Sequence, residues 1–209
     1  GGDDALIGEG GNDVLRGEEG DDFLSGDAGR DMIFGGTGND DILAGEGADM
    51  VYGDDGQDRI FGNEGDDILN GGLGDDTLHG DEGNDLFVAS EGDGSDVYDG
   101  GTGTDTLDMS AILANITVDL GIGLMGHGAS TGTGYDSLNG IENVVTGRGA
   151  DTIMANAAVN VLDGGEGDNT FVFRSVADAR GDTILGFNAG DVIDLSGIDA
   201  NAQMGGLQA

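Results

Sequence analysis

The chain has 209 residues, of which 46 are Gly and 43 are Asp or Glu, whereas only six are Arg and none is Lys, Pro, Cys or Trp. Its formal charge of -37 at pH 7 repels nucleic acid and anionic membranes and attracts cations, which argues against polyanionic partners. Without Cys there is no disulfide framework and no thiolate metal site, and no apolar run approaches the roughly 20 residues of a membrane span.

Such a composition is typical of a disordered chain, because low hydrophobicity and self-repulsion oppose folding. The first part of the chain nevertheless repeats a nine-residue pattern, G-G-x-G-x-D-x-U-x, in which U is a large apolar residue. Gly at the fourth position, Asp at the sixth and the apolar residue at the eighth keep one register. The sixth-position residues are Asp4, Asp13, Asp22, Asp31, Asp40, Asp49, Asp58, Asp67, Asp76 and Asp85. The eighth-position residues are Leu6, Leu15, Leu24, Ile33, Ile42, Val51, Ile60, Leu69, Leu78 and Phe87.

Each nonapeptide is predicted to form a six-residue turn and a three-residue strand. Gly supplies positive φ angles in the turn, and strand alternation sends the eighth-position side chain to one face. Two nonapeptides, 18 residues, then make one coil: turn, strand, turn and strand back. The sequence therefore predicts an all-β fold, a parallel β-roll or solenoid with a thin aliphatic core.

Asp residues 18 apart in the sequence would stack along one edge, roughly 4.8 Å apart by sheet spacing. Two such carboxylates repel by about 1 kcal/mol in water and about 3 kcal/mol at an effective dielectric of 20, so a cation is expected between the turns. Carboxylates and backbone carbonyls without Cys or clustered His form the all-oxygen site that suits Ca²⁺. Eight facing pairs, from Asp4/Asp22 to Asp67/Asp85, set a minimum of about eight calcium ions.

The stretches GGTGNDDIL (35–43) and GGLGDDTLH (71–79) resemble the nonapeptide of RTX (repeats-in-toxin, hemolysin-type) proteins. The resemblance implies a right-handed parallel β-roll, export through a type I secretion channel, and folding once external calcium is met. It also implies that each ion takes the second and fourth carbonyls and the Asp of one turn, with the first and third carbonyls and the Asp of the turn 18 residues on. One implied site joins Gly36, Gly38 and Asp40 with Gly53, Asp55 and Asp58, and the next joins Gly45, Gly47 and Asp49 with Gly62, Glu64 and Asp67. Further implied carbonyl ligands are those of Gly11, Gly20, Gly29, Gly56, Gly65, Gly71, Gly72, Gly74 and Gly80.

The register breaks after Val88, where two extra residues precede Asp96, and resumes as far as Asp105; both are predicted ligands. Residues 107–145 lose the period and are interpreted as longer strands that continue the sheets across a loop at 121–135. The spacing then returns, with predicted ligands Asp151, Asn160 and Asn169 and the carbonyls of Gly147, Gly149 and Gly164. The expected divisions are a repeat roll (1–106), a non-repeat β segment (107–145), a second repeat block (146–173) and a C-terminal cap (174–209).

The distal stretches DTLDMS, IENVVTGRGADTIMANAAVNVLDGGEGDNTFVF and DTILGFNAGDVIDLSGIDA resemble the C-terminal region of serralysin-type metalloproteases and other RTX exoproteins. That family continues beyond IDLSGIDA into a secretion signal, whereas this chain stops at GGLQA. Residue 1 falls inside a repeat, and the N-terminus lacks a signal-peptide pattern. We therefore interpret the chain as a fragment of a larger secreted, extracellular protein.

Other chemistry fits poorly. The serralysin protease site is an H-E-x-x-H helix, whereas His79 and His127 are isolated, and no Lys follows the Gly-rich turns as a phosphate loop requires. Paired carboxylates recur in every coil, so no pair stands apart as a glycosidase dyad. Absence of Lys excludes, within this segment, the acylated lysines of pore-forming RTX toxins. The stretch around Asp178 and Asp182 favours a solvated loop over a terminal ion site. No catalytic residue is predicted.

One outer face is predicted to be apolar and to dock another domain or a second copy of the chain. Its central row is Val14, Met32, Met50, Ile68 and Leu86, flanked by Phe34, Tyr52 and Val88. The favoured function is a non-catalytic calcium-binding RTX module that folds on extracellular Ca²⁺ and supports type I secretion and the stability of a larger exoprotein. The alternatives are a rigid adhesin or extender segment, and the accessory domain of a secreted protease, lipase or alginate epimerase. Few aromatic residues argue against carbohydrate binding.

Overall fold

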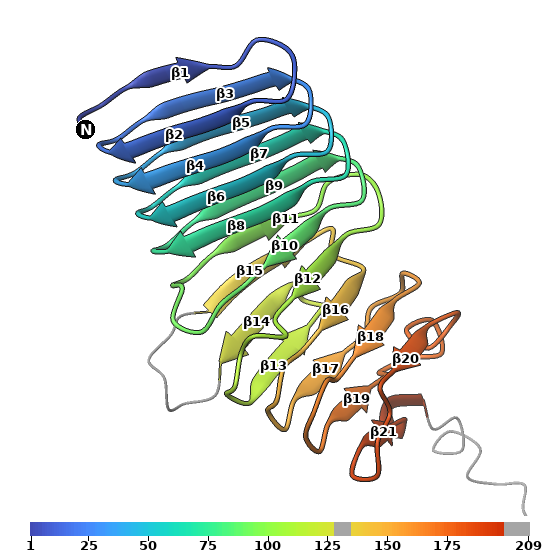
Figure 1. Cartoon of the computed structure of the whole chain (residues 1–209). Helices are drawn as coiled ribbons and strands as arrows, with labels where there is room; N and C mark the ends of the chain where they lie inside the picture. The colour runs from blue at the N-terminus through green and yellow to red at the C-terminus, as the bar shows by residue number, and fades with distance from the viewer. Residues whose placement is uncertain (128–134, 199–209) are drawn as a thin grey trace, which may run out of the picture.

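The computed structural model describes residues 1–127 and 135–198, which form short strands stacked in two sheets and one 3-10 turn (Figure 1). The six-residue strands are β2 (Val14–Glu19), β3 (Phe23–Ala28), β4 (Met32–Thr37), β5 (Asp41–Glu46), β6 (Met50–Asp55), β7 (Arg59–Glu64), β8 (Ile68–Leu73) and β9 (Thr77–Glu82). The shorter elements are β1 (Ala5–Ile7), β10 (Leu86–Val88), β11 (Val97–Asp99), β12 (Thr106–Asp108), β13 (Ile116–Asp119), β14 (Leu124–His127), β15 (Tyr135–Asn139), β16 (Asn143–Val145), β17 (Thr152–Met154), β18 (Val161–Asp163), β19 (Thr170–Val172), β20 (Thr183–Leu185), β21 (Val192–Asp194) and η1 (Ser196–Ile198).

Successive strands of the repeat region alternate between the two sheets. The 12-stranded sheet has the order β1-β3-β5-β7-β9-β11-β15-β14-β13-β17-β19-β21, and the 9-stranded sheet has the order β2-β4-β6-β8-β10-β12-β16-β18-β20. Neighbouring repeat strands are parallel and offset by one coil, as in the pair Leu15↔Ile33. The prediction of an all-β parallel roll is confirmed.

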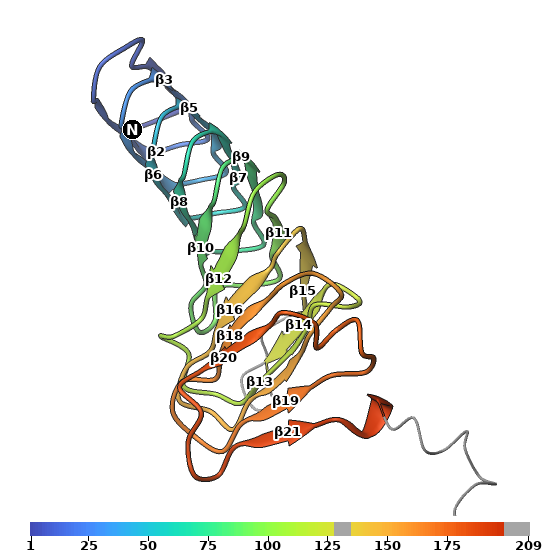
Figure 2. The same ribbon diagram turned by 90° about the vertical axis from the view of Figure 1, so that its right-hand side faces the viewer.

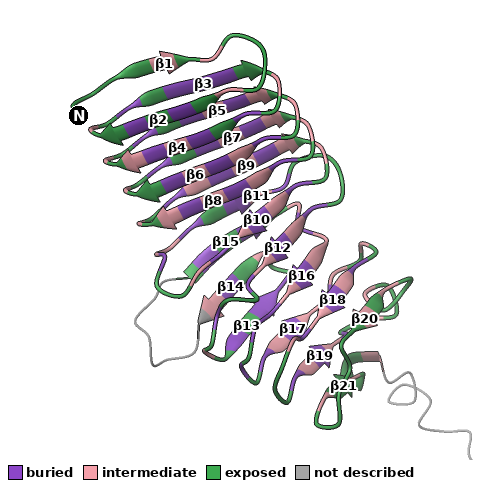
Figure 3. Cartoon of the chain, viewed as in Figure 1, coloured by how far each residue is buried: buried purple, intermediate pink, exposed green. Residues whose placement is uncertain are grey.

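The core lies between the sheets. Every eighth-position residue from Leu24 to Phe87 is fully buried, one large apolar side chain per nonapeptide. Buried residues recur along the strands of both sheets in Figure 3. Past Leu107 the core takes in further residues, among them Met109, Ile112 and Phe173. Figure 2 shows the corresponding change from a narrow N-terminal stack to a broader C-terminal part. The C-terminal part therefore buries more apolar surface per coil.

The predicted division of each nonapeptide into a three-residue strand and a six-residue turn is wrong for β2 to β9. These strands have six residues because the first positions of each turn stay in register with the next coil, as in Glu18↔Gly36 and Glu19↔Thr37. The turn begins where these segments end. Gly36, within β4, and Gly38, just after it, have φ angles of 116° and 130°, which side-chain-bearing residues adopt with difficulty.

Residues 107–145 continue both sheets, as expected, but their strands are not longer than those of the repeats. They have three to five residues, because the parallel pairing of the described strands does not continue past the strand into a following turn as it does in β2 to β9. The expected loop at 121–135 contains β14, which is antiparallel to β13 and β15 and buries Met125. Residues 128–134 of that loop lie outside the described part. As a result β13 and β14 enter the 12-stranded sheet only.

The segment expected to be a C-terminal cap adds one strand to each sheet, β20 and β21, and its residues 199–209 lie outside the described range. It is fixed to β13 by Arg174, whose Nη1 and Nη2 donate to the two carboxylate oxygens of Asp119 at 3.0 and 2.6 Å. Asp119 is 5% exposed. Among the described residues we find no helix with the length and apolar character of a membrane span.

Candidate metal-binding turns

The sixth-position Asp residues form two hydrogen-bonded ladders, one for the turns that enter each sheet. In each step the backbone N–H of one Asp donates to a carboxylate oxygen one coil further on, at 2.6 to 2.9 Å. The first ladder is Asp4, Asp22, Asp40, Asp58, Asp76, Asp96 and Asp136. The second is Asp13, Asp31, Asp49, Asp67, Asp85, Asp105 and Glu142.

The second carboxylate oxygen of most ladder residues is buried and has no hydrogen-bond donor in the described structure. Asp58, Asp67 and Asp76 are each 1% exposed. The carboxylates with such an Oδ2 atom are those of Asp13, Asp22, Asp31, Asp40, Asp49, Asp58, Asp67, Asp76, Asp85, Asp105, Asp136, Asp151 and Asp182. Burying a charged oxygen without a partner is costly, so these atoms require a proton or a cation.

The turns place backbone against these oxygens. A Cβ added to Gly62 would lie 2.5 Å from Oδ2 of Asp67 and 2.8 Å from the carbonyl oxygen of Gly80, one coil on. Only Gly allows this approach without displacing the carboxylate. Carboxylate and carbonyl oxygens thus come together at the base of the turn, where the sequence places Gly62, Asp67 and Gly80 among the ligands.

Burial governs the proton affinity of these groups. Together with the charge of neighbouring ladder carboxylates, it raises the pKa of Asp58 and of Asp67 to about 7, against the lowering effect of the backbone N–H that each carboxylate accepts. Burial likewise raises the pKa of Asp76 and of Asp85 to about 6, and the charges of Asp93 and of Asp105 add to these two shifts. Without a cation, these ladder carboxylates therefore bind protons near neutral pH. A cation between the turns would favour their ionised form.

The donor set determines which metal fits. Among the described residues no three His, Asp or Glu side chains converge on one point, so a site here needs two ladder carboxylates together with backbone carbonyls. His79 stacks on Phe61, with ring centroids 4.9 Å apart, and its Nδ1 lies 3.6 Å from Asp99. The His127 side chain is outside the described part. An all-oxygen set of this kind suits calcium, and the residues present fit it.

The break after Val88 keeps the ladder intact. The backbone N–H groups of Asp76 and Asp85 bond to Asp96 and Asp105 across 20 residues in place of 18, as two extra residues require. Asp96 differs from the other ladder residues because its Oδ2 accepts a 2.9 Å hydrogen bond from Tyr98 Oη. Asp151, whose Oδ1 accepts from Ile116 N at 2.8 Å, retains an unpartnered Oδ2.

Sequence reasoning missed several ladder positions. Asp136 stands in the ladder because Gly132, Gly134 and Asp136 keep the G-x-G-x-D spacing inside the stretch interpreted as non-repetitive. Glu142 accepts the Asp105 N–H at 2.9 Å in place of an Asp. Asp182 and Asp191, nine residues apart, accept from Asn160 N and Asn169 N. Asp182, predicted to lie in a solvated loop, has a buried Oδ2.

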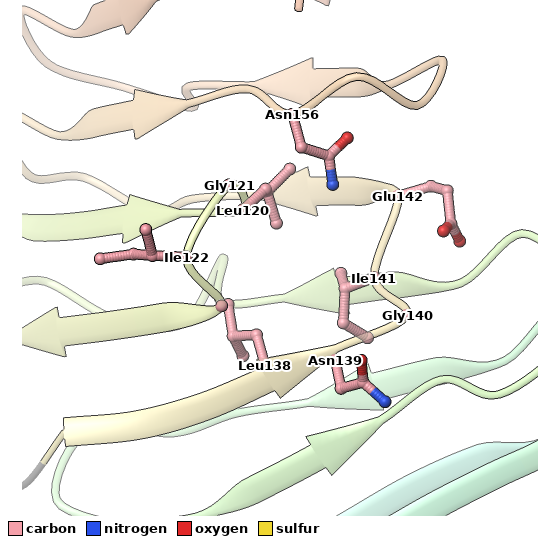
Figure 4. A pocket seen from close by; sticks show the side chains of 10 residues that line it. Leu120, Gly121, Ile122, Leu138, Asn139, Gly140, Ile141, Glu142 and Asn156 are labelled. Carbon is pink, nitrogen blue, oxygen red and sulfur yellow. The ribbon is translucent and has the colours of Figure 1, made fainter.

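A separate cavity of about 330 Å³ lies where β13 and β14 enter the sheet (Figure 4). Its wall includes Gly121, Ile122, Asn139, Glu142 and Asn156. Within the described residues none of its side chains carries a buried unpartnered oxygen, and Glu142 is already bonded to the Asp105 N–H. The cavity therefore borders the end of the second ladder at Glu142 but offers no buried carboxylate oxygen that lacks a donor.

Two family models match the chain. The RTX calcium-binding nonapeptide repeat matches in four copies, at residues 1–33, 25–60, 34–69 and 52–87. The Peptidase M10 serralysin C-terminal model matches residues 95–207. No curated protein matches the chain.

Proposed function

The chain belongs to the serralysin C-terminal family and carries RTX calcium-binding repeats, and we propose that it is a non-catalytic module that folds on meeting extracellular calcium. In this proposal it supports the type I secretion and the stability of a larger exoprotein. Neither matched model is that of a catalytic domain. The observation that carries the proposal is the double row of buried carboxylate oxygens without donors.

The ladder residues named above, with the carbonyls of the Gly-rich turns, would hold the ions. Bound calcium supplies positive charge between facing turns, where carboxylates would otherwise repel one another. The backbone N–H of each Asp fixes one oxygen of the next carboxylate, which leaves the other oxygen directed into the turn. In the folded form, the second oxygen of each such carboxylate is thus available to an ion.

Apolar burial contributes little to the N-terminal stack, which depends on its backbone ladders and its carboxylate turns. Each nonapeptide buries one large apolar side chain, worth about 1.5–3 kcal/mol. The chain charge of -37 adds self-repulsion. An ion that binds only the folded form stabilises it by RT ln(1 + [L]/Kd), which couples folding to calcium. Extracellular modules often bind in the roughly 0.1 to 1 mM range.

The test is far-ultraviolet circular dichroism of the chelator-stripped chain during a calcium titration, with a magnesium titration as the control. We expect a cooperative change from coil to β signal near millimolar calcium and no such change with magnesium. A β signal that has the same amplitude before and after chelation would refute calcium-coupled folding.

A docking role for the outer face of the 9-stranded sheet is a second, compatible proposal. Val14 and Met32 are 60% and 37% exposed, and Met32, Met50 and Ile68 border a cavity of about 220 Å³. In the neighbouring row, Phe34 stacks on Tyr52 with ring centroids 5.2 Å apart. We propose that the row from Val14 to Leu86 packs against the passenger of the larger protein or a second copy.

Sedimentation of the chain, alone and joined to its passenger, tests this docking. Met50→Thr with Tyr52→Thr should weaken a measured association. The matched control is Phe61→Thr with His79→Thr on the opposite sheet, which removes a stacked pair from the other face. Equal sedimentation of all variants would count against the docking face.

A further inference from the structure

Asn169 occupies a ladder position but bonds differently from the Asp residues. It is 1% exposed, and its Oδ1 accepts the backbone N–H of Asp151 at 2.9 Å, as a ladder Asp would. Its Nδ2 donates a buried 2.8 Å hydrogen bond to the carbonyl oxygen of Gly164, at the start of the same turn. Asn169 and Gly164 were both predicted to be ligands, yet here they satisfy each other.

The amide stands where the second carboxylate oxygen stands in the repeats. A Cβ added to Gly164 would lie 2.7 Å from Asn169 Nδ2, and one added to Gly62 would lie 2.5 Å from Asp67 Oδ2. In the Asp turn both groups at this point are acceptors, which cannot bond to each other. In the Asn turn an N–H group lies between them, so the turn closes without added positive charge.

The turn that leads through Asn160 into β18 of the 9-stranded sheet is closed in a related way. Asn160 is fully buried, and its Nδ2 donates to the Glu142 carbonyl oxygen at 2.7 Å and to Asn156 Oδ1 at 3.2 Å. Its Oδ1 accepts from Asn156 N at 3.3 Å. The turn that it ends, ANAAVN (155–160), contains no Gly to bring carbonyls inward. The side-chain amides of Asn160 and Asn156 therefore make the hydrogen bonds that close this turn.

The surrounding structure can hold these turns without a cation. Phe171, Leu162 and Ile153 are fully buried in the broader C-terminal core. Asp191, one coil beyond Asn169, has a donor on each oxygen, Asn169 N at 2.8 Å and Asn188 N at 2.6 Å. In this part of the described chain only the side chains of Asp151 and Asp182 keep buried oxygens without donors.

We infer that the turns ending at Asn160 and Asn169 are closed by their own amide groups in place of calcium, and that the coils from β16 to β19 persist when calcium is removed. These two residues, predicted to be ligands, do not fit the ion. The inference rests on the proposed function. The inference divides the chain into a stack that needs calcium to fold, tested at β3 to β8, and a C-terminal part, β16 to β19, that stays folded without calcium.

Hydrogen exchange of the whole 209-residue chain tests the division. After chelation, amides in β3 to β8 should lose their protection. Amides in β17 to β19 should then exchange about tenfold or more slowly than the amides in β3 to β8, which corresponds to ~1.4 kcal/mol of local stability. Equal loss of protection in both parts would overturn the inference. Full protection of both parts would instead refute the proposed function.

A substitution makes the test specific. Asn169→Asp removes the closing N–H, so the variant should lose protection in β17 to β19 on chelation while keeping it in calcium. The matched control is Asn115→Asp, an exposed residue of the same region whose Oδ1 accepts from Ala150 N and would still do so. If Asn169→Asp and Asn115→Asp behave alike in chelator, the amide does not replace an ion. Should Asn169→Asp fail to fold even in calcium, the exchange pattern of the unaltered chain decides.

Discussion

The backbone N–H of Asp58 donates a 2.8 Å hydrogen bond to Oδ1 of Asp76, 18 residues further along. Each Asp inside the two ladders is thus both donor, through its backbone, and acceptor, through its side chain. The carboxylate of one coil thus accepts a hydrogen bond from the backbone N–H of the coil before it. Because Oδ1 is used in this way, only Oδ2 remains for an ion.

Removing one ladder carboxylate should therefore cause two losses. We expect Asp76→Ala to leave the buried Asp58 N–H without an acceptor, which costs about 1–3 kcal/mol, and to raise the calcium midpoint of folding. Asp76→Asn should cost less stability, because it keeps an acceptor. Chemical unfolding in saturating calcium measures the first effect, and the circular dichroism titration measures the second. The control Glu46→Ala removes an exposed carboxylate, and an equally large effect there would contradict the ladder account.

The raised pKa values predict that acid stabilises the calcium-free fold. The pKa of Asp58, Asp67 and Asp136 rises to about 7, above the ordinary 3.8, so the folded form binds protons more tightly than the unfolded form. This contribution is fully present below about pH 4 and is lost as the pH rises to about 7. The β signal of dialysed, calcium-free protein should fall over that interval. A β signal that increases with pH would refute the prediction.

Protons and calcium should also compete in the titration, because both satisfy the same buried oxygens. The calcium midpoint of folding should therefore rise as the pH is lowered from about 8 to about 6. A midpoint independent of pH would show that the ladder carboxylates are not the ligands.

The fourth-position glycines from Gly20 to Gly83 should tolerate no side chain. Gly47 has a φ of 144°, and a Cβ there would overlap the carbonyl oxygen of Gly29, one coil earlier. We expect Gly47→Ala to prevent the stacking of these coils and to abolish cooperative folding in calcium. Gly92→Ala is the matched control, with φ of 86° but open space around its Cβ, and should cost only about 1 kcal/mol. Similar unfolding midpoints for both variants would contradict this account.

The Arg174–Asp119 pair should fix the C-terminal segment. Asp119 is nearly buried, and Arg174→Ala would leave its carboxylate with only the backbone N–H groups of Gly121 and Ile122. We expect a loss of about 1–3 kcal/mol in the free energy of unfolding, since a nearly buried carboxylate loses its charged donor. Arg148→Ala breaks an exposed pair and should cost under about 1 kcal/mol. Thermal unfolding in calcium distinguishes the two.

The repeat region could be predicted from sequence because the Gly, Asp and apolar positions of the nonapeptide keep one register, and each is required for a different physical reason. The eighth-position residues identify the core, and the Asp column identifies the ladders. The strand lengths were mispredicted because backbone pairing through a Gly-rich turn leaves no signal in hydrophobic alternation.

The distal half resisted prediction for other reasons. Asp136 was overlooked because an insertion separates it from its predecessor Asp96 by 40 residues. The sequence shows that Asn169 has an amide N–H where the repeats have a carboxylate oxygen. The acceptor of that N–H, the Gly164 carbonyl oxygen, is a backbone atom and can be identified only from the fold.

The two sheets do not have the same number of strands. Between β15 and β17 the 12-stranded sheet holds β14 and β13, whereas β12, β16 and β18 are direct neighbours in the 9-stranded sheet. At a spacing of about 4.8 Å, two extra strands lengthen one side of the roll by about 10 Å. Because the hairpin β13–β14 lengthens one sheet alone, the axis of the stack is expected to turn toward the shorter sheet. The direction of the C-terminal part is then set by the strand order of the two sheets, without a linker between separate domains.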